Sequence, residues 1–241
     1  MSWYLDAGLV GAAVGAAGGL LAPRAVQALP EPPEDPATAA AFEETEPKER
    51  YADIAGLPWL LPTAIVASTL VGFLVGARLD FSWELLAVLP FVPAAVALFV
   101  IDARTRYLPT WLMGPFYGWT LVVGVLAAIQ RSSWEPVISM AAGWAVFGGF
   151  FTLMWMLVPA GGLGFGDVRL TGLLGLQLGL VSWGAVPVGM FAGIMSSGVV
   201  ALLLLVTRAG KRYPYGPYLL FGGLVGVLWG QQFAHWYWPS S

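Results

Sequence analysis

The chain has 241 residues, of which 58% are hydrophobic and 10% are charged, and its mean hydropathy is +0.75. A soluble domain of this length could not bury so much apolar surface, so the composition excludes a soluble globule and a disordered chain and favours a polytopic membrane protein. The net charge of −3 provides no basic surface for nucleic acid, and the absence of cysteine excludes disulfides, thiolate metal sites and a cysteine nucleophile.

Eight mostly apolar runs predict eight membrane-spanning helices in an all-α protein. In chain order they cover residues 5–22, 57–75, 85–101, 111–129, 137–158, 168–181, 185–206 and 215–230. We therefore expect a first transmembrane helix over 1–22 and an acidic, proline-rich loop over 23–56. A membrane-embedded domain over 57–230 and an interfacial C-terminal tail over 231–241 would follow.

The basic residues are concentrated in every second loop between these runs. Nine of the eleven lysines and arginines fall in the first, third, fifth and seventh loops, whereas Arg78 and Arg131 fall in the others. The positive-inside rule then places the odd-numbered loops in the cytoplasm and both termini on the extracytoplasmic side.

Two aspartates at the edges of apolar runs are the strongest candidates for chemistry, because ionisable groups are costly there. Asp102 ends the third run, and Asp167 follows a glycine-rich segment and precedes the sixth. Each alone has a simpler interpretation, Asp102 as a partner of a nearby arginine and Asp167 as a helix N-cap. Together, two carboxyl groups that share a proton can activate water and protonate a leaving amine, which is the chemistry of an aspartic protease. This chemistry needs no metal and no cofactor.

The surroundings of the two aspartates suggest finer roles. Gly164 and Gly166 lack side chains, so a substrate backbone could approach Asp167 closely. A helix N-terminus favours negative charge and a C-terminus disfavours it. The hypothesis from sequence is therefore that Asp167 is the ionised base and Asp102 carries the proton.

Three stretches of the chain resemble the type IV prepilin peptidases, which are membrane aspartic proteases with a Gly-x-Gly-Asp motif. They are residues 101–109, residues 162–170 and residues 214–218, the last reading Pro-Tyr-Gly-Pro-Tyr. The resemblance implies an endopeptidase of the bacterial inner membrane that cleaves the basic leader of prepilins and pseudopilins on the cytoplasmic side. It implies Asp102 and Asp167 as the catalytic pair, with substrate-binding or structural support from Pro109, Gly164, Gly166, Arg169, Gly216 and Pro217.

The sequence departs from this family in two places. Thr110 stands where the family often has aspartate after Leu-Pro. Many members also methylate the new amino terminus and carry two cysteine pairs in the first loop, so the cysteine-free loop here argues against N-methyltransferase activity. That loop carries eight acidic and three basic residues, and its net charge suggests electrostatic attraction of a basic leader.

Two alternatives remain open from the sequence. One is a preflagellin peptidase or another Gly-x-Gly-Asp intramembrane protease, with the same chemistry and a different substrate. The other is a non-enzymatic transporter or a scaffold for pilus assembly, in which the aspartates would serve proton coupling.

Overall fold

The computed structural model describes residues 3–31, 49–158, 163–207 and 213–237, and every regular element in these ranges is helical. The prediction of an all-α protein is thus confirmed for this part of the chain. The elements are α1 (Leu5–Gln27), α3 (Tyr51–Ala55), α4 (Leu60–Leu79), α5 (Trp83–Val88), α6 (Phe91–Thr105), α7 (Thr110–Gln130), α8 (Glu135–Gly143), the π-helix η1 (Trp144–Gly148), α9 (Gly149–Leu157), α10 (Phe165–Val181), α11 (Ala185–Val206) and α12 (Gly216–Tyr237).

Six helical stretches of the described chain are long and apolar enough to cross a membrane. They are α1, α4, α5 with α6, α7, α8 with η1 and α9, and α11. α10 has 17 residues and is not among the six, and neither is α12. The fold is therefore that of a multi-pass membrane protein, while the count of eight crossings stays a prediction.

Several helix ends differ from those expected from hydropathy. α1 continues past residue 22 to Gln27, and α12 continues past residue 230 to Tyr237, so residues 231–237 extend a helix and do not form a separate tail. The short helix α3 lies inside the expected loop, because the Glu31 carboxylate accepts hydrogen bonds from the Tyr51 and Ala52 backbone N–H groups at its start. Apolar content alone does not report such capping contacts.

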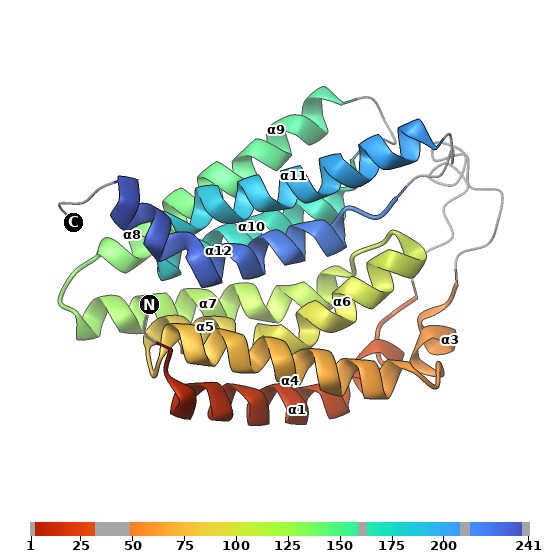
Figure 1. Ribbon diagram of the computed structural model, residues 1–241, viewed down its shortest axis with the longest axis horizontal. Coiled ribbons are helices and arrows are strands. Elements are labelled where there is room, and N and C mark those ends of the chain that lie inside the picture. Colours follow the sequence, from red (N-terminus) through yellow and green to blue (C-terminus); the bar gives the residue numbers. More distant parts are fainter. Residues whose placement is uncertain (1–2, 32–48, 159–162, 208–212, 238–241) are drawn as a thin grey trace.

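The helices lie roughly side by side in one elongated bundle (Figure 1). α1, α4, α5, α6 and α7 occupy one half, α8, α9, α11 and α12 occupy the other, and α10 lies among them. The start of α1 and the end of α12 lie at the left end of the view, while α3 and the starts of α10 and α12 lie toward the right end. The carboxyl end of α6 and the amino ends of α10 and α12 therefore meet at one end of the bundle.

α10 forms the centre of the bundle. Fourteen of its seventeen residues are buried, and it contacts helices of both halves. A helix buried on all sides in this way lies in the core of its bundle. This central position fixes the first turn of α10, which carries Asp167, against the ends of α6 and α7.

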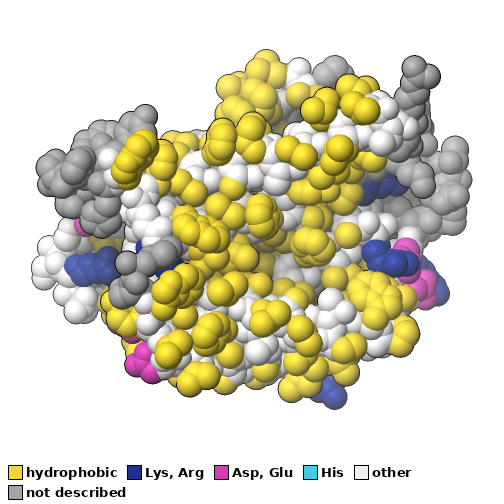
Figure 2. Space-filling model, in the orientation of Figure 1, with side chains coloured by type: hydrophobic (Ala, Val, Ile, Leu, Met, Phe, Trp, Pro, Cys, Tyr) yellow, Lys and Arg dark blue, Asp and Glu magenta, His cyan; other side chains and the backbone are white. Residues whose placement is uncertain are grey.

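The face of the bundle that Figure 2 shows is largely apolar. Large side chains such as Leu202 and Leu203 on α11 and Val122 on α7 are more than half exposed. Contiguous apolar surface on this scale is unfavourable in water but matches the hydrocarbon of a bilayer. The composition of the chain is thus explained by a surface that faces lipid as well as by a buried core.

Candidate active site

The candidate active site lies where α6 ends and where α10 and α12 begin, three segments that are far apart in the sequence. Asp102 lies in the last turn of α6, Asp167 in the first turn of α10, and Gly216 is the first residue of α12. Both aspartates are buried, with exposed fractions of 3% for Asp102 and 8% for Asp167. The two carboxyl groups are close enough for the charge of Asp102 to act on Asp167. The pair expected from sequence therefore shares one location in the fold.

Asp102 is held by the start of α12. Its Oδ2 atom accepts a hydrogen bond of 2.8 Å from the Gly216 backbone N–H, which is one of the N–H groups that a helix leaves unpaired at its N-terminus. A Cβ atom at position 216 would lie 2.7 Å from the same oxygen, so only glycine allows this approach without a shift. The C-terminal cap of α6 is Arg106, which has a left-handed backbone conformation. The Arg106 backbone N–H donates a hydrogen bond to the Asp102 carbonyl oxygen.

Asp167 lies in a tight first turn of α10. Gly164 precedes the helix, and its carbonyl oxygen accepts the Asp167 N–H at 3.1 Å. Asp167 is therefore the third residue of the helix, and the N-cap interpretation of its role is wrong. Its Oδ1 atom is buried without a hydrogen-bond partner among the described residues, and a Cβ atom at Gly164 would lie 3.1 Å from its Oδ2. Gly161 and Gly162, which begin the glycine-rich segment, lie outside the described residues.

Gly166 and Pro109 shape the junction between α10 and the chain that leaves α6. A Cβ atom at Gly166 would lie 2.9 Å from Leu108 Cβ, and Leu108 is itself buried. Pro109 follows in an extended conformation and precedes the first residue of α7, where its fixed φ angle and missing N–H cost nothing. Gly166 thus allows the first turn of α10 to pack directly on Leu108.

Arg169 links α10 to α7. Its guanidinium group lies 4.6 Å from the centre of the Phe165 ring, and its Nη1 donates a hydrogen bond to Thr110 Oγ1. The Tyr117 hydroxyl donates to the Arg169 carbonyl oxygen at 2.5 Å. These contacts favour a structural role for Arg169 over contact with substrate.

Sequence reasoning missed two features of the site. It included Gly216 and Pro217 as supporting residues without a specific role, whereas the Gly216 N–H contacts one of the carboxylates directly. Pro217 is buried in the first turn of α12, where its missing N–H is not needed. Tyr117 was not considered at all. A glycine followed by proline at the start of a helix is the signal that could have identified a free backbone donor.

The fold and the site together define a class of protein: a multi-pass helical membrane protein with two buried carboxyl groups that meet at one end of its bundle. Residues 89–206 match the family model described as "Type IV leader peptidase family". This segment contains Asp102, Asp167 and the whole of α10, and it ends before Gly216. This segment, a little under half of the chain, is similar to the type IV leader peptidase family.

Curated relatives agree with this assignment. The chain is 28% identical over 179 residues to a prepilin leader peptidase/N-methyltransferase of Aeromonas salmonicida (strain A449). That alignment covers 73% of this chain and 60% of the relative. The protein of the same name from Stutzerimonas stutzeri is 29% identical, over 71% of this chain and 59% of its own length. The one from Pseudomonas aeruginosa is 26% identical, over 73% of this chain and 60% of its own length. The chain thus spans about three fifths of the length of these relatives. No solved structure matches it.

Proposed function

We propose that this protein is an aspartic endopeptidase that cleaves the basic leader of a prepilin or pseudopilin. The observation that carries the proposal is that Asp102 and Asp167 are both buried and lie at the same end of the bundle, where α6 ends and α10 begins (Figure 1). The similarity of residues 89–206 to the leader peptidase family and the names of the relatives support the same activity and the same class of substrate. The proposal does not include N-methyltransferase activity.

In this proposal the two carboxyl groups hydrolyse a peptide bond by general acid–base catalysis. One carboxylate removes a proton from water as the water oxygen bonds to the scissile carbonyl carbon, and the other carboxyl group donates its proton to the carbonyl oxygen. The tetrahedral intermediate then collapses: the C–N bond breaks as the first carboxyl group passes its proton to the leaving amine, and one hydroxyl of the intermediate returns a proton to the second carboxylate. Atoms and charges balance, and one water molecule is consumed for each bond cleaved.

The contacts of the pair favour Asp102 as the ionised base and Asp167 as the proton donor. Asp102 accepts the Gly216 N–H at the N-terminus of α12, and such a charge-assisted hydrogen bond stabilises the carboxylate. Asp167 Oδ1 is buried without a partner among the described residues, an environment that disfavours a negative charge. This assignment reverses the hypothesis from sequence, which considered only the dipole of each aspartate's own helix.

The proposed orientation places the carboxylate end of the bundle in the cytoplasm of a bacterial cell, with the protein in the inner membrane and both termini outside. Arg50, Arg104 and Arg106 belong to this end of the bundle, whereas Arg78 and Arg131 belong to the helix ends opposite. Basic residues concentrate on the cytoplasmic side of membrane proteins. Accessibility of a single introduced cysteine at either end to a membrane-impermeant maleimide, in intact cells, tests this orientation.

Coexpression with a candidate prepilin tests the proposed activity. The expected result is a substrate that migrates faster by the length of its leader when the unmodified protein is present. Asp102→Asn and Asp167→Asn, made separately, should each abolish the shift, because each carboxyl group has its own proton to transfer. Undiminished cleavage by either variant would overturn the two-aspartate mechanism. Absence of cleavage by the unmodified protein across a panel of prepilins would favour the non-enzymatic alternative.

A further inference from the structure

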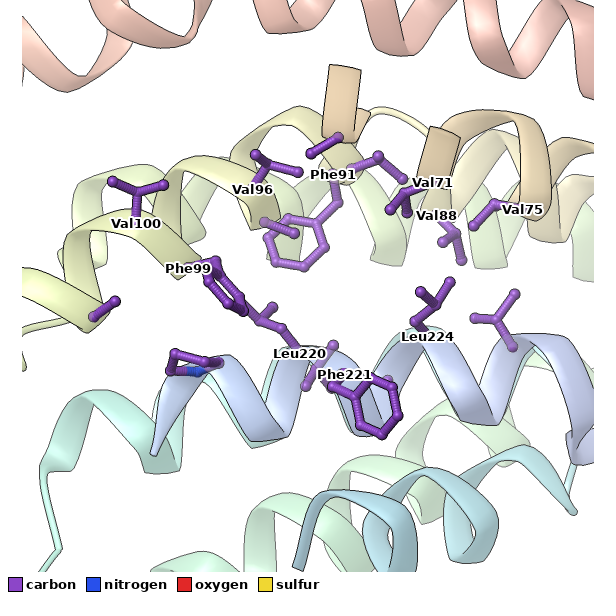
Figure 3. A pocket seen from close by; sticks show the side chains of 18 of the residues that line it. Val71, Val75, Val88, Phe91, Val96, Phe99, Val100, Leu220, Phe221 and Leu224 are labelled. Atoms are coloured by element: carbon purple, nitrogen blue, oxygen red, sulfur yellow. The ribbon is translucent and has the colours of Figure 1, made fainter. Parts of the chain in front are cut away.

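An apolar groove runs along the outside of the bundle between α4, α6 and α12. Its volume is about 450 Å³, and Figure 3 shows side chains of α6 and α12 facing each other across it. The residues that line it are almost all apolar, as expected for a cavity that opens toward lipid. We call it the α6–α12 groove.

The spacing of the lining residues shows that the groove runs parallel to the helix axes. Ala67, Val71 and Val75 on α4 and Val92, Val96 and Val100 on α6 all line it at intervals of four residues. Residues four apart form a ridge along one side of a helix, and the space between two such ridges accepts the ridge of another helix. The groove therefore has the shape that suits a helical partner more than a compact small molecule.

One end of the groove adjoins the carboxylate pair. Ala103, Arg104 and Pro217 line this end, and they are the chain neighbours of Asp102 and Gly216, which are joined by the Gly216 N–H hydrogen bond. From Pro217 to Val227 the groove follows α12 for about 15 Å, at about 1.5 Å per residue. A helix of about ten residues lying there would end beside the carboxyl groups.

The charge at this end is compatible with a basic segment. Arg104 is paired with Glu49 through a hydrogen bond of 2.9 Å between Nη2 and Oε1, so its positive charge is compensated. Helices that enter the membrane from the cytoplasm carry basic residues on that side. The paired Arg104 therefore does not repel the flank of such a helix.

We propose that the α6–α12 groove holds an apolar membrane helix of the substrate and so presents the bond at its cytoplasmic end to Asp102 and Asp167. This inference rests on the proposed peptidase function. It adds a binding surface that makes the enzyme selective for substrates with an apolar helix next to the cleaved bond. A lipid chain is the competing occupant, and it would confer no such selectivity.

Cysteine cross-linking tests the position of the substrate, because the protein contains no cysteine of its own. A prepilin that the unmodified protein cleaves would carry one cysteine in its apolar segment, and Asp167→Asn would keep it uncut. Ala95→Cys on α6, which lines the groove, should form a disulfide with it under mild oxidation. Ala141→Cys on the exposed side of α8 is the matched control and should form none. Equal cross-linking at both positions, or cross-linking at Ala141→Cys alone, would overturn the inference.

Blocking the groove separates this inference from the proposed function. Ala95→Trp should lower kcat/KM for the membrane-inserted prepilin by more than about tenfold, while a short soluble peptide spanning only the cleavage site is cut at an unchanged rate. Ala141→Trp should affect neither substrate. Normal cleavage of both substrates by Ala95→Trp, or an equal loss on both, would overturn the groove inference and leave the peptidase function standing. If the unmodified protein cuts no prepilin, the proposed function fails and the inference fails with it.

Discussion

Replacement of Gly216 by alanine should displace Asp102 and slow cleavage. The added methyl carbon would lie 2.7 Å from Asp102 Oδ2 and 2.9 Å from Cγ, whereas ordinary contacts of this kind begin at 3.4 Å. The shortfall is about 0.7 Å, and either the carboxyl group or the first turn of α12 must move by that amount. Because the backbone N–H of Gly216 is the hydrogen-bond donor to Asp102, both movements weaken this bond.

Two independent arguments give the size of the effect. Misplacement of a catalytic group by about 1 Å costs about 100-fold in rate. A hydrogen bond to a charged group contributes about 1.5–3 kcal/mol, which corresponds to about 10- to 150-fold at 1.36 kcal/mol per factor of ten. We therefore expect Gly216→Ala to lower kcat by about 10- to 100-fold.

The assay is cleavage of a prepilin by the purified protein in detergent, with the thermal unfolding midpoint measured on the same samples. Gly189→Ala is the matched control, because its methyl carbon would lie equally close, at 2.7 Å, to the end of the Leu178 side chain and away from the carboxyl groups. Gly189→Ala should retain cleavage. Gly216→Ala with a wild-type kcat would refute the reasoning that the start of α12 holds Asp102.

Three further predictions concern residues around the site. Gly166→Ala should lower kcat by about tenfold through contact with Leu108 Cβ, 2.9 Å from the added methyl carbon. A double-mutant cycle with Leu108→Gly, which removes that Cβ, should recover part of the loss, and a strictly additive double variant would contradict this. Arg169→Lys removes the planar contact with Phe165, worth about 0.5–1 kcal/mol, so the unfolding midpoint should fall by about 1–4 °C with kcat retained; a large loss of kcat would instead indicate substrate contact. Burial, with smaller contributions from Tyr107 and Glu31, raises the pKa of Tyr51 in α3, so its folded form disfavours ionisation and stability falls as pH rises above about 10. Tyr51→Phe should flatten this fall in thermal unfolding between pH 7 and 10.5, and an unchanged slope would show that Tyr51 does not cause it.

The membrane class and the helical fold were predictable from the sequence because hydropathy is a local property. A run of apolar residues must satisfy its backbone hydrogen bonds within itself in lipid, so a helix follows whatever its neighbours are. The two aspartates could be identified as candidates for the same reason, since an ionisable group at the end of an apolar run is visible without any contact. The interruption of the third run was less visible: α5 ends at Val88 and α6 begins after Pro90.

Contacts between distant segments were beyond the sequence. α3 depends on a carboxylate about twenty residues earlier in the chain, and Arg169 binds to a threonine 59 residues away. Neither pairing leaves a periodic or compositional signal. The sequence therefore identified Arg169 as a supporting residue but not its role in joining α10 to α7.

The sequence by itself determined that this chain lies in a membrane as helices and that Asp102 and Asp167 are the groups most able to perform chemistry. The division of roles that we propose for them rests on contacts that only the tertiary structure makes. The sequence could weigh the dipole of α6 at Asp102 but not the N–H of Gly216, which lies 114 residues away and reaches the carboxylate only when α12 packs beside α6. The burial, charges and hydrogen bonds around a carboxyl group depend on which residues lie near it in space, and tertiary packing determines those residues.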